Sequence, residues 1–373
     1  MATRYHAEHV GSLLRPPYLL RARDAFEAGT LTMEELREAE DRAITELIDV
    51  QKQAGVEVFT DGEARRESWR AGLMESLSGL VPVPRTMRWY RNGKELSAEE
   101  TLTDGVAVTT RVSRKQDLTG TEAAFMAGHA PGQFKITMIS ASMGAMVWDA
   151  ERSAGAYPTP GGLIEDLTQL LIEEIEALVS NHGVRWVQLD SLTYNQVIDT
   201  ANSGSTRAAF SPEQALETAI AVDAAIVSAV KRARPDVTVG MHICRGNYRS
   251  SWLAQGSYEP VAERLFNEVP VDRFLLEYDT ERAGGFEPLR FVPSGSAGPT
   301  VVLGLITTKT GQLEDADAVC RRIDEAARYV PLENLAVSPQ CGFASGSLGN
   351  LITAADQRRK LDLVVSTARQ VWG

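Results

Sequence analysis

Short, apolar, strand-like runs alternate with amphipathic helical stretches along this chain, and this alternation constrains its fold more than any other feature. The strand-like runs are nearly continuously apolar and do not alternate apolar with polar residues. Such runs are typical of parallel strands that helices cover on both faces. The predicted strands are a first one that closes at 9–12, then 56–60, 135–141, 184–189, 238–244, 273–278, 300–306 and 335–338.

Eight strands with helices between them predict an α/β protein built as a (β/α)8 barrel, the TIM-barrel architecture. The length of 373 residues suits a barrel with enlarged loops, because the basic unit takes about 250 residues. An open, doubly wound sheet is the alternative, but no Gly-x-Gly-x-x-Gly motif follows any predicted strand.

Two long helices carry their own start signals. Thr32 and Glu35 form a capping box at the head of a helix predicted over 32–55. Ser211 and Gln214 form a second capping box, so another long helix is predicted to begin there. These signals separate the predicted strands and support the alternating pattern.

Residues 80–133 break the rhythm of strands and helices. They contain several prolines, a charged run at 88–91 (Arg-Trp-Tyr-Arg) and a strand-like run at 106–110. We interpret the segment as a hairpin inserted after strand two, over the barrel mouth; a separate small domain is the alternative. No low-complexity tract or internal repeat interrupts the chain, so 1–373 is predicted to be one domain.

The net charge and the number of cysteines limit which partners the protein can bind and in which compartment it is expected. The chain has 50 acidic and 38 basic residues and a formal net charge of -12, which argues against nucleic acid or an anionic membrane as partner. No stretch approaches the ~18 apolar residues of a membrane span, and the N-terminus shows no secretion signal. Three cysteines, Cys244, Cys320 and Cys341, suit a reducing compartment, so a cytoplasmic protein is expected.

Side chains that ligate metals or transfer protons follow the ends of the predicted strands. In a barrel these positions converge on the C-terminal face, where active sites are built. We therefore expect contacts between residues that lie far apart in the sequence. The residues concerned are Asp61, Glu63, Asp190, His242, Cys244, Glu277, Asp279 and Cys341.

Four of these residues form a candidate metal site. His242 and Cys244 lie on the same face of an extended segment, because strand side chains repeat every second residue. Glu277 and Cys341 would approach from later strands, and this set of N, S and O donors suits tetrahedral zinc. The alternative for an isolated His-x-Cys pair is a cysteine that acts only as a small buried residue.

The residues around these positions resemble the zinc motifs of the cobalamin-independent methionine synthase family. The matching segments are His-Ile-Cys-Arg-Gly-Asn at 242–247, Leu-Leu-Glu-Tyr-Asp at 275–279 and Ser-Pro-Gln-Cys-Gly-Phe at 338–343. Further agreement lies at 9–16, 61–63 and 187–190. The resemblance covers essentially the whole chain, keeps the order of the family's motifs and concerns the catalytic C-terminal barrel alone.

The resemblance implies a Zn²⁺ enzyme in which His242, Cys244, Glu277 and Cys341 are the metal ligands and the catalytic residues. Coordination to the metal would deprotonate a substrate thiol and keep its sulfur nucleophilic. In such enzymes a weak ligand can leave the metal when substrate binds, which makes Glu277 a candidate for that exchange. The implied activity is that of a homocysteine S-methyltransferase, which forms methionine from homocysteine and a methyl donor.

The resemblance also implies the residues that hold homocysteine. Glu63 and Asp190 match carboxylates that accept hydrogen bonds from its ammonium group, and the backbone near Gly11 and Ser12 matches the turn that holds its carboxylate. A salt bridge at a strand end is the alternative for the two acids. For His9, a role in packing is weighed equally with a catalytic one, and a homo-oligomer is compatible with the sequence.

Two departures from the family leave the methyl donor open. Folate-dependent members have a second, N-terminal barrel, for which 373 residues leave no room. In addition, Arg-Gly-Asn follows Cys244 and Ser-Leu-Thr-Tyr follows Asp190, where the long enzymes carry other residues. The donor is therefore a methyl-folate or another methyl carrier.

Two other functions compete with this one. An epoxyalkane:coenzyme M transferase would use the same thiol chemistry. Its sulfonate substrate would require Arg15, Arg245 or another cation in place of the acid pair, Glu63 and Asp190. A metal-free, decarboxylase-like barrel is the alternative from a different class.

Overall fold

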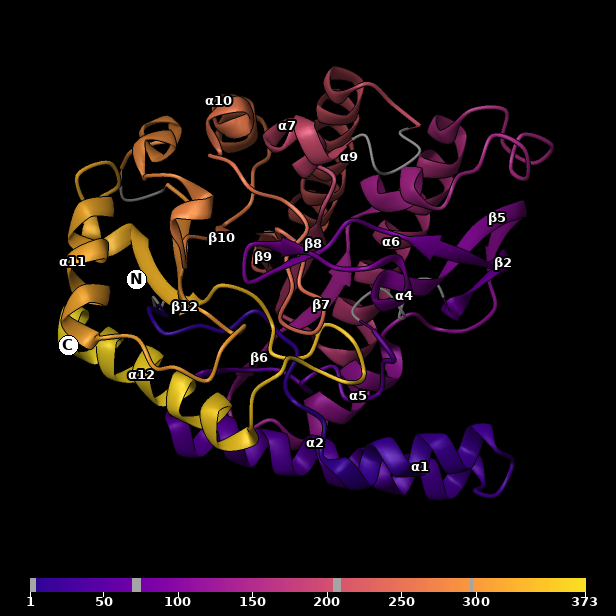
Figure 1. The fold of residues 1–373 in the computed structure, drawn as a ribbon, viewed down its shortest axis with the longest axis horizontal. Helices are drawn as coiled ribbons and strands as arrows, with labels where there is room; N and C mark the ends of the chain where they lie inside the picture. Colours follow the sequence, from indigo (N-terminus) through magenta and orange to yellow (C-terminus); the bar gives the residue numbers. More distant parts are fainter. Residues whose placement is uncertain (1–4, 69–74, 204–208, 296–297) are drawn as a thin grey trace.

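A parallel sheet of six strands forms the centre of the molecule, in the order β12-β11-β10-β9-β8-β7. The computed structural model describes residues 5–68, 75–203, 209–295 and 298–373. Helices surround the sheet (Figure 1). The six strands, almost entirely buried, are β7 (Ile136–Ile139), β8 (Trp186–Ser191), β9 (Thr238–Ile243), β10 (Arg273–Glu277), β11 (Thr300–Ile306) and β12 (Leu335–Pro339).

Two further pairings continue the sheet at its edges. β1 (Val58–Phe59) pairs in parallel with β6 (Gln133–Phe134), which leads directly into β7. At the other edge, Ala7 forms a parallel bridge to Val337 of β12. Across the described ranges, no strand ladder joins the segment around Ala7 to β1. The predicted α/β architecture is confirmed, while the hydrogen bonding does not itself close a ring of eight strands.

The long helices begin where the sequence supplies caps. At the head of α2 the Glu35 amide donates to Thr32 Oγ1 over 3.2 Å, and at α9 the Gln214 amide donates to Ser211 Oγ over 3.2 Å, so both predicted capping boxes are confirmed. The longer helices are α1 (Pro17–Glu27), α2 (Met33–Ala54), α5 (Gly120–His129), α6 (Pro160–His182), α9 (Pro212–Ala233), α10 (Glu259–Glu268), α11 (Ala316–Ala326) and α12 (Ala354–Trp372). The short ones are α4 (Ala98–Thr101), η1 (Ala141–Met146), α7 (Asn195–Ile198), α8 (Thr200–Ser203), η2 (Glu281–Ala283), η3 (Glu287–Phe291) and η4 (Leu332–Asn334). None of the helices in the described part of the chain combines the length and the apolar character that crossing a membrane requires.

Between β1 and β6 the chain forms an antiparallel ribbon, which consists of β2 (Leu77–Thr86) and β5 (Leu102–Arg114). It lies beside α6 in Figure 1. The pairing starts at Leu77, so the ribbon begins before the predicted boundary of 80. Within it, β3 (Tyr90–Arg91) and β4 (Lys94–Glu95) form a small antiparallel pair. That 80–133 is an insertion into one domain stays a prediction.

The ribbon is attached to the loop that follows β9. Tyr90 and Trp252 exchange two backbone hydrogen bonds of 2.9 Å each. Their rings also stack, with centroids 4.6 Å apart. Because the loop after β9 starts at the candidate ligand Cys244, this attachment holds the ribbon over the C-terminal ends of the strands.

A buried ionic network ties the N-terminal segment to the sheet. Lys135, just before β7, donates to Glu8 Oε1 over 2.9 Å and to Gln188 Oε1 over 2.7 Å. Arg273, the first residue of β10, donates to Glu8 Oε2 over 2.8 Å. Burial of such charges is tolerated only when each is paired and hydrogen-bonded, as here. The network therefore fixes the segment that carries Ser12 against the strands.

Candidate metal centre

Four side chains with metal-ligating atoms lie together at the C-terminal ends of β9, β10 and β12. His242 belongs to β9, Cys244 follows it, Glu277 ends β10, and Cys341 follows β12. Their candidate ligand atoms all lie within 4.8 Å of one another, and all four residues are buried. The structure thus brings together the four residues that the sequence grouped.

Strand register explains how these residues meet. In the parallel sheet His242 is paired with Asp190 of β8 on one side and with Leu275 of β10 on the other. Glu277 is paired with Gly304 of β11. A Cβ atom at Gly304 would lie 2.7 Å from Gln340 Cα. The glycine therefore lets the chain after β12 pass close enough to carry Cys341 to the group.

Hydrogen bonds leave the ligand atoms of His242 and Glu277 free. His242 Nδ1 lies 3.1 Å from the Leu275 carbonyl, which only accepts, so Nδ1 carries a proton and Nε2 is the atom left for a metal. Burial lowers the pKa of His242, but the neighbouring Cys341, Asp190 and Glu277 outweigh burial and raise it to about 9, so a metal ion would displace a proton from Nε2. Glu277 Oε1 accepts from the Arg245 amide over 2.6 Å. His242 Nε2 and Glu277 Oε2 are buried without a hydrogen-bond partner, although Arg282 Nη2 forms an ion pair with Oε2 at 3.5 Å. Because buried polar atoms are normally satisfied, this pair fits a bound cation.

The two thiols face each other without a covalent bond. Cys244 Sγ and Cys341 Sγ lie 3.5 Å apart, well beyond the ~2.05 Å of a disulfide. The hydrogen bond between them raises the pKa of Cys244 and lowers the pKa of Cys341. A metal ion bound here would displace the proton that the two sulfurs share.

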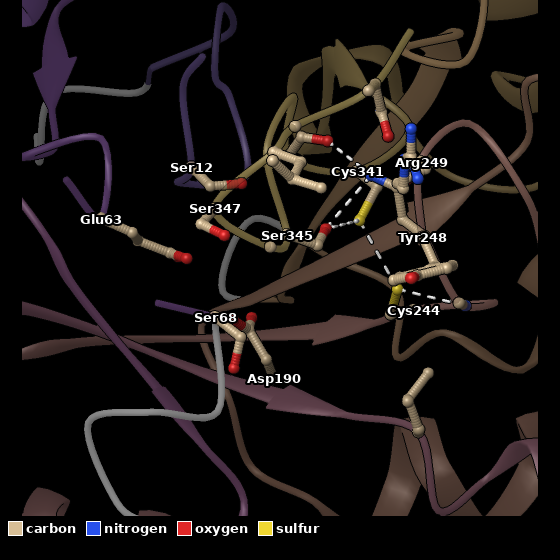
Figure 2. Close-up of a pocket in the computed structure, with 18 of the residues that line it drawn as sticks. Ser12, Glu63, Ser68, Asp190, Cys244, Tyr248, Arg249, Cys341, Ser345 and Ser347 are labelled. Carbon is tan, nitrogen blue, oxygen red and sulfur yellow. Dashed lines mark hydrogen bonds between the residues drawn. The ribbon is translucent and has the colours of Figure 1, made fainter. Parts of the chain in front are cut away.

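A cavity of about 500 Å³ opens above this group. Figure 2 shows that the carboxylates of Glu63 and Asp190 point into it, with the two cysteine sulfurs beside them. Glu63 Oε1 accepts from Thr137 Oγ1 over 2.9 Å, while Oε2 is buried without a partner. Burial raises the pKa of Glu63, and it raises the pKa of Asp190 to about 7. A cationic group placed here would stabilise both charges.

Glu63 is held by a strained turn and by a neighbouring arginine. Its φ angle of 55° lies in the left-handed region, which non-glycine residues seldom adopt and which recurs at functional sites. Arg66 lies 4.0 Å from Glu63, but it pairs with Glu122 at 2.6 Å. Since Glu122 balances the charge of Arg66, the carboxylate of Glu63 is left for a cation in the cavity.

Gln188 and Lys135 orient Asp190, a role that the sequence reasoning missed. Lys135 Nζ donates to Gln188 Oε1 over 2.7 Å, which fixes the amide so that Nε2 faces Asp190. Gln188 Nε2 then donates to Asp190 Oδ1 over 2.8 Å. The available signal was a glutamine two residues before Asp190 in an otherwise apolar strand, hence on the same face.

The predicted carboxylate-binding turn reaches the cavity through one of its two residues. Ser12 lines the cavity, and its carbonyl accepts from the Phe343 amide over 2.9 Å. Gly11 is not among the residues that line it, but a Cβ there would lie 2.8 Å from Glu63 Oε1. Gly11 thus makes room for the Glu63 side chain. Binding of a carboxylate by this turn stays a prediction.

His9 lies outside the cavity lining. Its Nε2 is 3.0 Å from Gln51 Oε1, and burial lowers its pKa to about 3. A buried, neutral imidazole of this kind packs the N-terminal segment against α2. Of the two roles weighed for His9, this geometry supports packing.

Arg15 and Arg245 do not face the cavity either. Arg15 donates to the carbonyls of Glu63 and Arg66 over 2.9 and 2.7 Å. Arg245 is fully buried, donates to the Gly256 carbonyl and lies 4.2 Å above the ring of Tyr258. Among the described residues that line the cavity, Arg249 is the one arginine.

The end of β2 and the short connection to β3 supply a wall of the cavity that the sequence did not predict. Pro84, Met87 and Trp89 line it. The rings of Trp89 and Tyr248 have centroids 5.4 Å apart. A Cβ at Gly246 would lie 2.9 Å from the Trp89 ring, so the indole packs directly on the loop that starts at Cys244.

Fold and site together define an α/β protein with a buried candidate metal centre at the C-terminal ends of its parallel strands. Residues 7–368 match the family model described as "Cobalamin-independent synthase, Catalytic domain". The chain therefore belongs to the catalytic-domain family of the cobalamin-independent methionine synthases.

Similar proteins span nearly the same length. The uncharacterized protein YxjH of Bacillus subtilis (strain 168) is 37% identical over 377 residues, which cover 99% of this chain and 95% of that protein. A protein named methionine synthase from Pyrococcus horikoshii is 22% identical, over 94% of this chain and 92% of its own length.

Two solved structures share the fold. One is a candidate vitamin-B12-independent methionine synthase from Listeria monocytogenes, with a TM-score of 0.72, 31% identity, and coverage of 100% of this chain and 99% of that chain. The other is a B12-independent methionine synthase from Shewanella sp. W3-18-1 in complex with selenomethionine, with a TM-score of 0.73 and 19% identity over 99% and 98% of the two chains. At that lower identity the second likeness supports the fold alone.

Proposed function

We propose that this protein is a zinc-dependent thiol alkyltransferase that methylates homocysteine to methionine. The observation that carries the proposal is the buried group of His242, Cys244, Glu277 and Cys341, in which His242 Nε2 and Glu277 Oε2 accept no hydrogen bond. One nitrogen, two sulfurs and one carboxylate oxygen suit Zn²⁺ better than Mg²⁺ or Ca²⁺, which prefer oxygen ligands. When bound, zinc would lower the pKa of a thiol so that its thiolate forms at neutral pH.

The cavity residues would bind and orient homocysteine. The carboxylates of Glu63 and Asp190 would hold its ammonium group, since both are buried and Glu63 Oε2 lacks a partner. Gln188 would keep the Asp190 carboxylate aimed at that group. The backbone near Gly11 and Ser12 would receive the carboxylate of the amino acid.

We infer further that the barrel is complete and forms one domain over 1–373. Ala7 pairs with β12 at one edge of the sheet, and β1 pairs with β6 at the other. These edges would meet between the segment around Ala7 and β1, which gives eight strands. The segment 80–133 would then be an insertion between the second and third of them.

The two alternative functions receive less support from the geometry. A sulfonate such as that of coenzyme M needs a cation in place of the acid pair, but Arg15 and Arg245 donate to backbone carbonyls and lie outside the cavity lining. Arg249, which does line the cavity, lies across the two cysteine sulfurs from Glu63 (Figure 2). A metal-free barrel would leave His242 Nε2 buried and unsatisfied, which costs about 1–3 kcal/mol, and would leave Glu277 Oε2 to Arg282, 3.5 Å away.

Metal analysis tests the proposal with a matched pair of cysteine variants. Protein purified without chelator should hold about one zinc per chain, as expected for a site with a full ligand set. Cys341→Ala should lose the metal, whereas Cys320→Ala, on the half-buried face of α11, should keep it. Circular dichroism should show both variants folded. Zinc retained by Cys341→Ala would show that Cys341 is not a ligand.

Calorimetric titration separates the candidate thiols. Homocysteine should bind the zinc-loaded protein more tightly than coenzyme M does, because Glu63 and Asp190 attract an ammonium and repel a sulfonate. A preference for coenzyme M would refute the homocysteine assignment.

A further inference from the structure

The wall next to the candidate ligands is aromatic and rich in sulfur. Trp89 and Tyr248 line the cavity with their rings 5.4 Å apart, and Met87 and Met146 line it as well. In Figure 2 Tyr248 and Arg249 lie on the other side of the two cysteine sulfurs from Glu63. The aromatic wall is therefore separate from the acid pair that would hold the amino acid.

The cavity carries an excess of negative charge. Its described lining residues include three carboxylates, Glu63, Glu67 and Asp190, and one guanidinium, that of Arg249 beside Tyr248 (Figure 2). Because the ammonium of homocysteine would balance part of the acid pair, the charge around the reacting sulfur decides which donor is attracted. At the reacting sulfur, two thiolates, the Glu277 and Asp279 carboxylates and a substrate thiolate would carry one negative charge more than Zn²⁺, the Arg282 guanidinium and the Lys309 ammonium together. An anionic donor, such as one with a glutamate tail, would meet repulsion here, whereas a cationic donor would be attracted.

The cavity also limits the size of the donor. Pockets of about 300–1,000 Å³ usually hold one drug-sized ligand. A volume of about 500 Å³ must here hold homocysteine and the donor's reactive end together. A compact donor meets this limit.

From the aromatic wall, the charge and the volume, we propose that the methyl donor is a small sulfonium cation bound against Trp89 and Tyr248. This inference rests on the proposed function. An aromatic face attracts an onium group through its negative π surface, and tryptophan attracts it best. The Met87 and Met146 thioethers add polarizable contacts for the methyl groups.

The transfer balances without another reactant. The thiol proton of homocysteine leaves to solvent, and the thiolate sulfur attacks one methyl carbon of the sulfonium. A new carbon–sulfur bond forms while the bond from that carbon to the sulfonium sulfur breaks, and its electron pair stays with the departing neutral sulfide. The products are methionine and a dialkyl sulfide, and no oxidation occurs. Because an anion and a cation become two neutral sulfur groups, a water-poor cavity favours the reaction.

Trimethylsulfonium, with methyl-folate and methylcobalamin as competing donors, tests the reaction in the zinc-loaded protein. Trimethylsulfonium should yield methionine and dimethyl sulfide. Trp89→Leu should raise the KM for trimethylsulfonium about 5- to 30-fold and leave the KM for homocysteine unchanged. Trp89→Phe keeps an aromatic face and should raise the KM for trimethylsulfonium by a smaller factor. A change in both KM values would overturn the proposal. So would the formation of methionine with methyl-folate or methylcobalamin as donor but not with trimethylsulfonium.

Binding without turnover gives an independent measurement. Tetramethylammonium, which cannot react, should bind the protein by calorimetry, and neutral tert-butanol at equal concentration should not. Trp89→Leu should weaken binding of tetramethylammonium by a similar factor, and equal binding of both compounds would overturn the proposal. Cobalt-substituted protein distinguishes the two levels of inference: Cys244 and Cys341 give a thiolate band of their own, and an increase of this band when homocysteine is added supports the proposed function, whether or not the cation binds. If that increase occurs and neither cation binds, only the sulfonium inference fails.

Discussion

Replacement of Gln188 by methionine tests how the cavity recognises an amino acid. Gln188 Nε2 donates to Asp190 Oδ1 over 2.8 Å, and methionine keeps the length of the side chain but removes this donor. A hydrogen bond to a charged group contributes about 1.5–3 kcal/mol. We therefore expect the pKa of Asp190, already raised to about 7 by burial, to rise by about one to two further units.

The consequence for substrate binding follows from the sign of that shift. Asp190 holds an ammonium group only when it is ionised, so binding improves as the pH rises through its pKa. At neutral pH the Gln188→Met variant should show a KM for homocysteine about 5- to 50-fold higher, recovering at more alkaline pH. The assay is the KM for homocysteine between pH 6 and 9, with zinc content measured in parallel.

A second variant at the same position separates orientation from charge. Gln188→Glu can still accept from Lys135 Nζ, but it places a carboxylate where the donor to Asp190 was. It should keep more of the free energy of unfolding than Gln188→Met and bind homocysteine still less well. An unchanged pH profile of KM in Gln188→Met, with zinc fully bound, would refute the assigned role of Gln188.

Three further variants test other parts of the molecule. Glu277→Gln keeps the size of the side chain but removes its charge, so a chelator competition should show weaker zinc binding; equal affinity would exclude Glu277 as a ligand. Gly11→Ala puts a Cβ 2.8 Å from Glu63 Oε1 and should raise the KM for homocysteine without loss of zinc. Lys135→Met leaves Glu8 with Arg273 alone, so urea unfolding should show a free energy of unfolding lower by about 3–5 kcal/mol. A loss below about 1 kcal/mol, as for an exposed lysine, would refute this role.

The candidate ligand group could be predicted because it depends on a regular rule. His242 and Glu277 lie in the last residues of parallel strands and Cys341 follows one, and such ends share one edge whatever the intervening loops do. The α/β class could be predicted because continuous apolar runs are typical of parallel strands that helices cover on both faces. Local rules also located the capping boxes at Thr32 and Ser211, since their hydrogen bonds span three residues.

The remaining features depend on contacts that no local pattern records. Trp89 reaches the cavity because the ribbon pairs with Trp252, some 160 positions away in a loop of different composition. The ribbon starts at Leu77 because strand register is set by the partner strand, and the sequence placed its boundary later. Likewise, the hydrogen bond from Lys135 to Gln188 forms only because β7 and β8 are neighbours in the sheet, and the sequence does not state which strands are neighbours.

The attachment of the ribbon by Tyr90 and Trp252 has a consequence for how such a protein could diversify. The side chains that would set the reaction lie at or just beyond the ends of the strands. Pro84, Met87 and Trp89 come from a segment attached to the loop after β9 by the Tyr90–Trp252 contacts and by a hydrogen bond of 3.1 Å from Arg91 Nε to Ser251 Oγ. Exchange of residues in the ribbon could change which donor is accepted without disturbing the strands. An exchange of ribbons between related chains would then transfer donor preference as a unit.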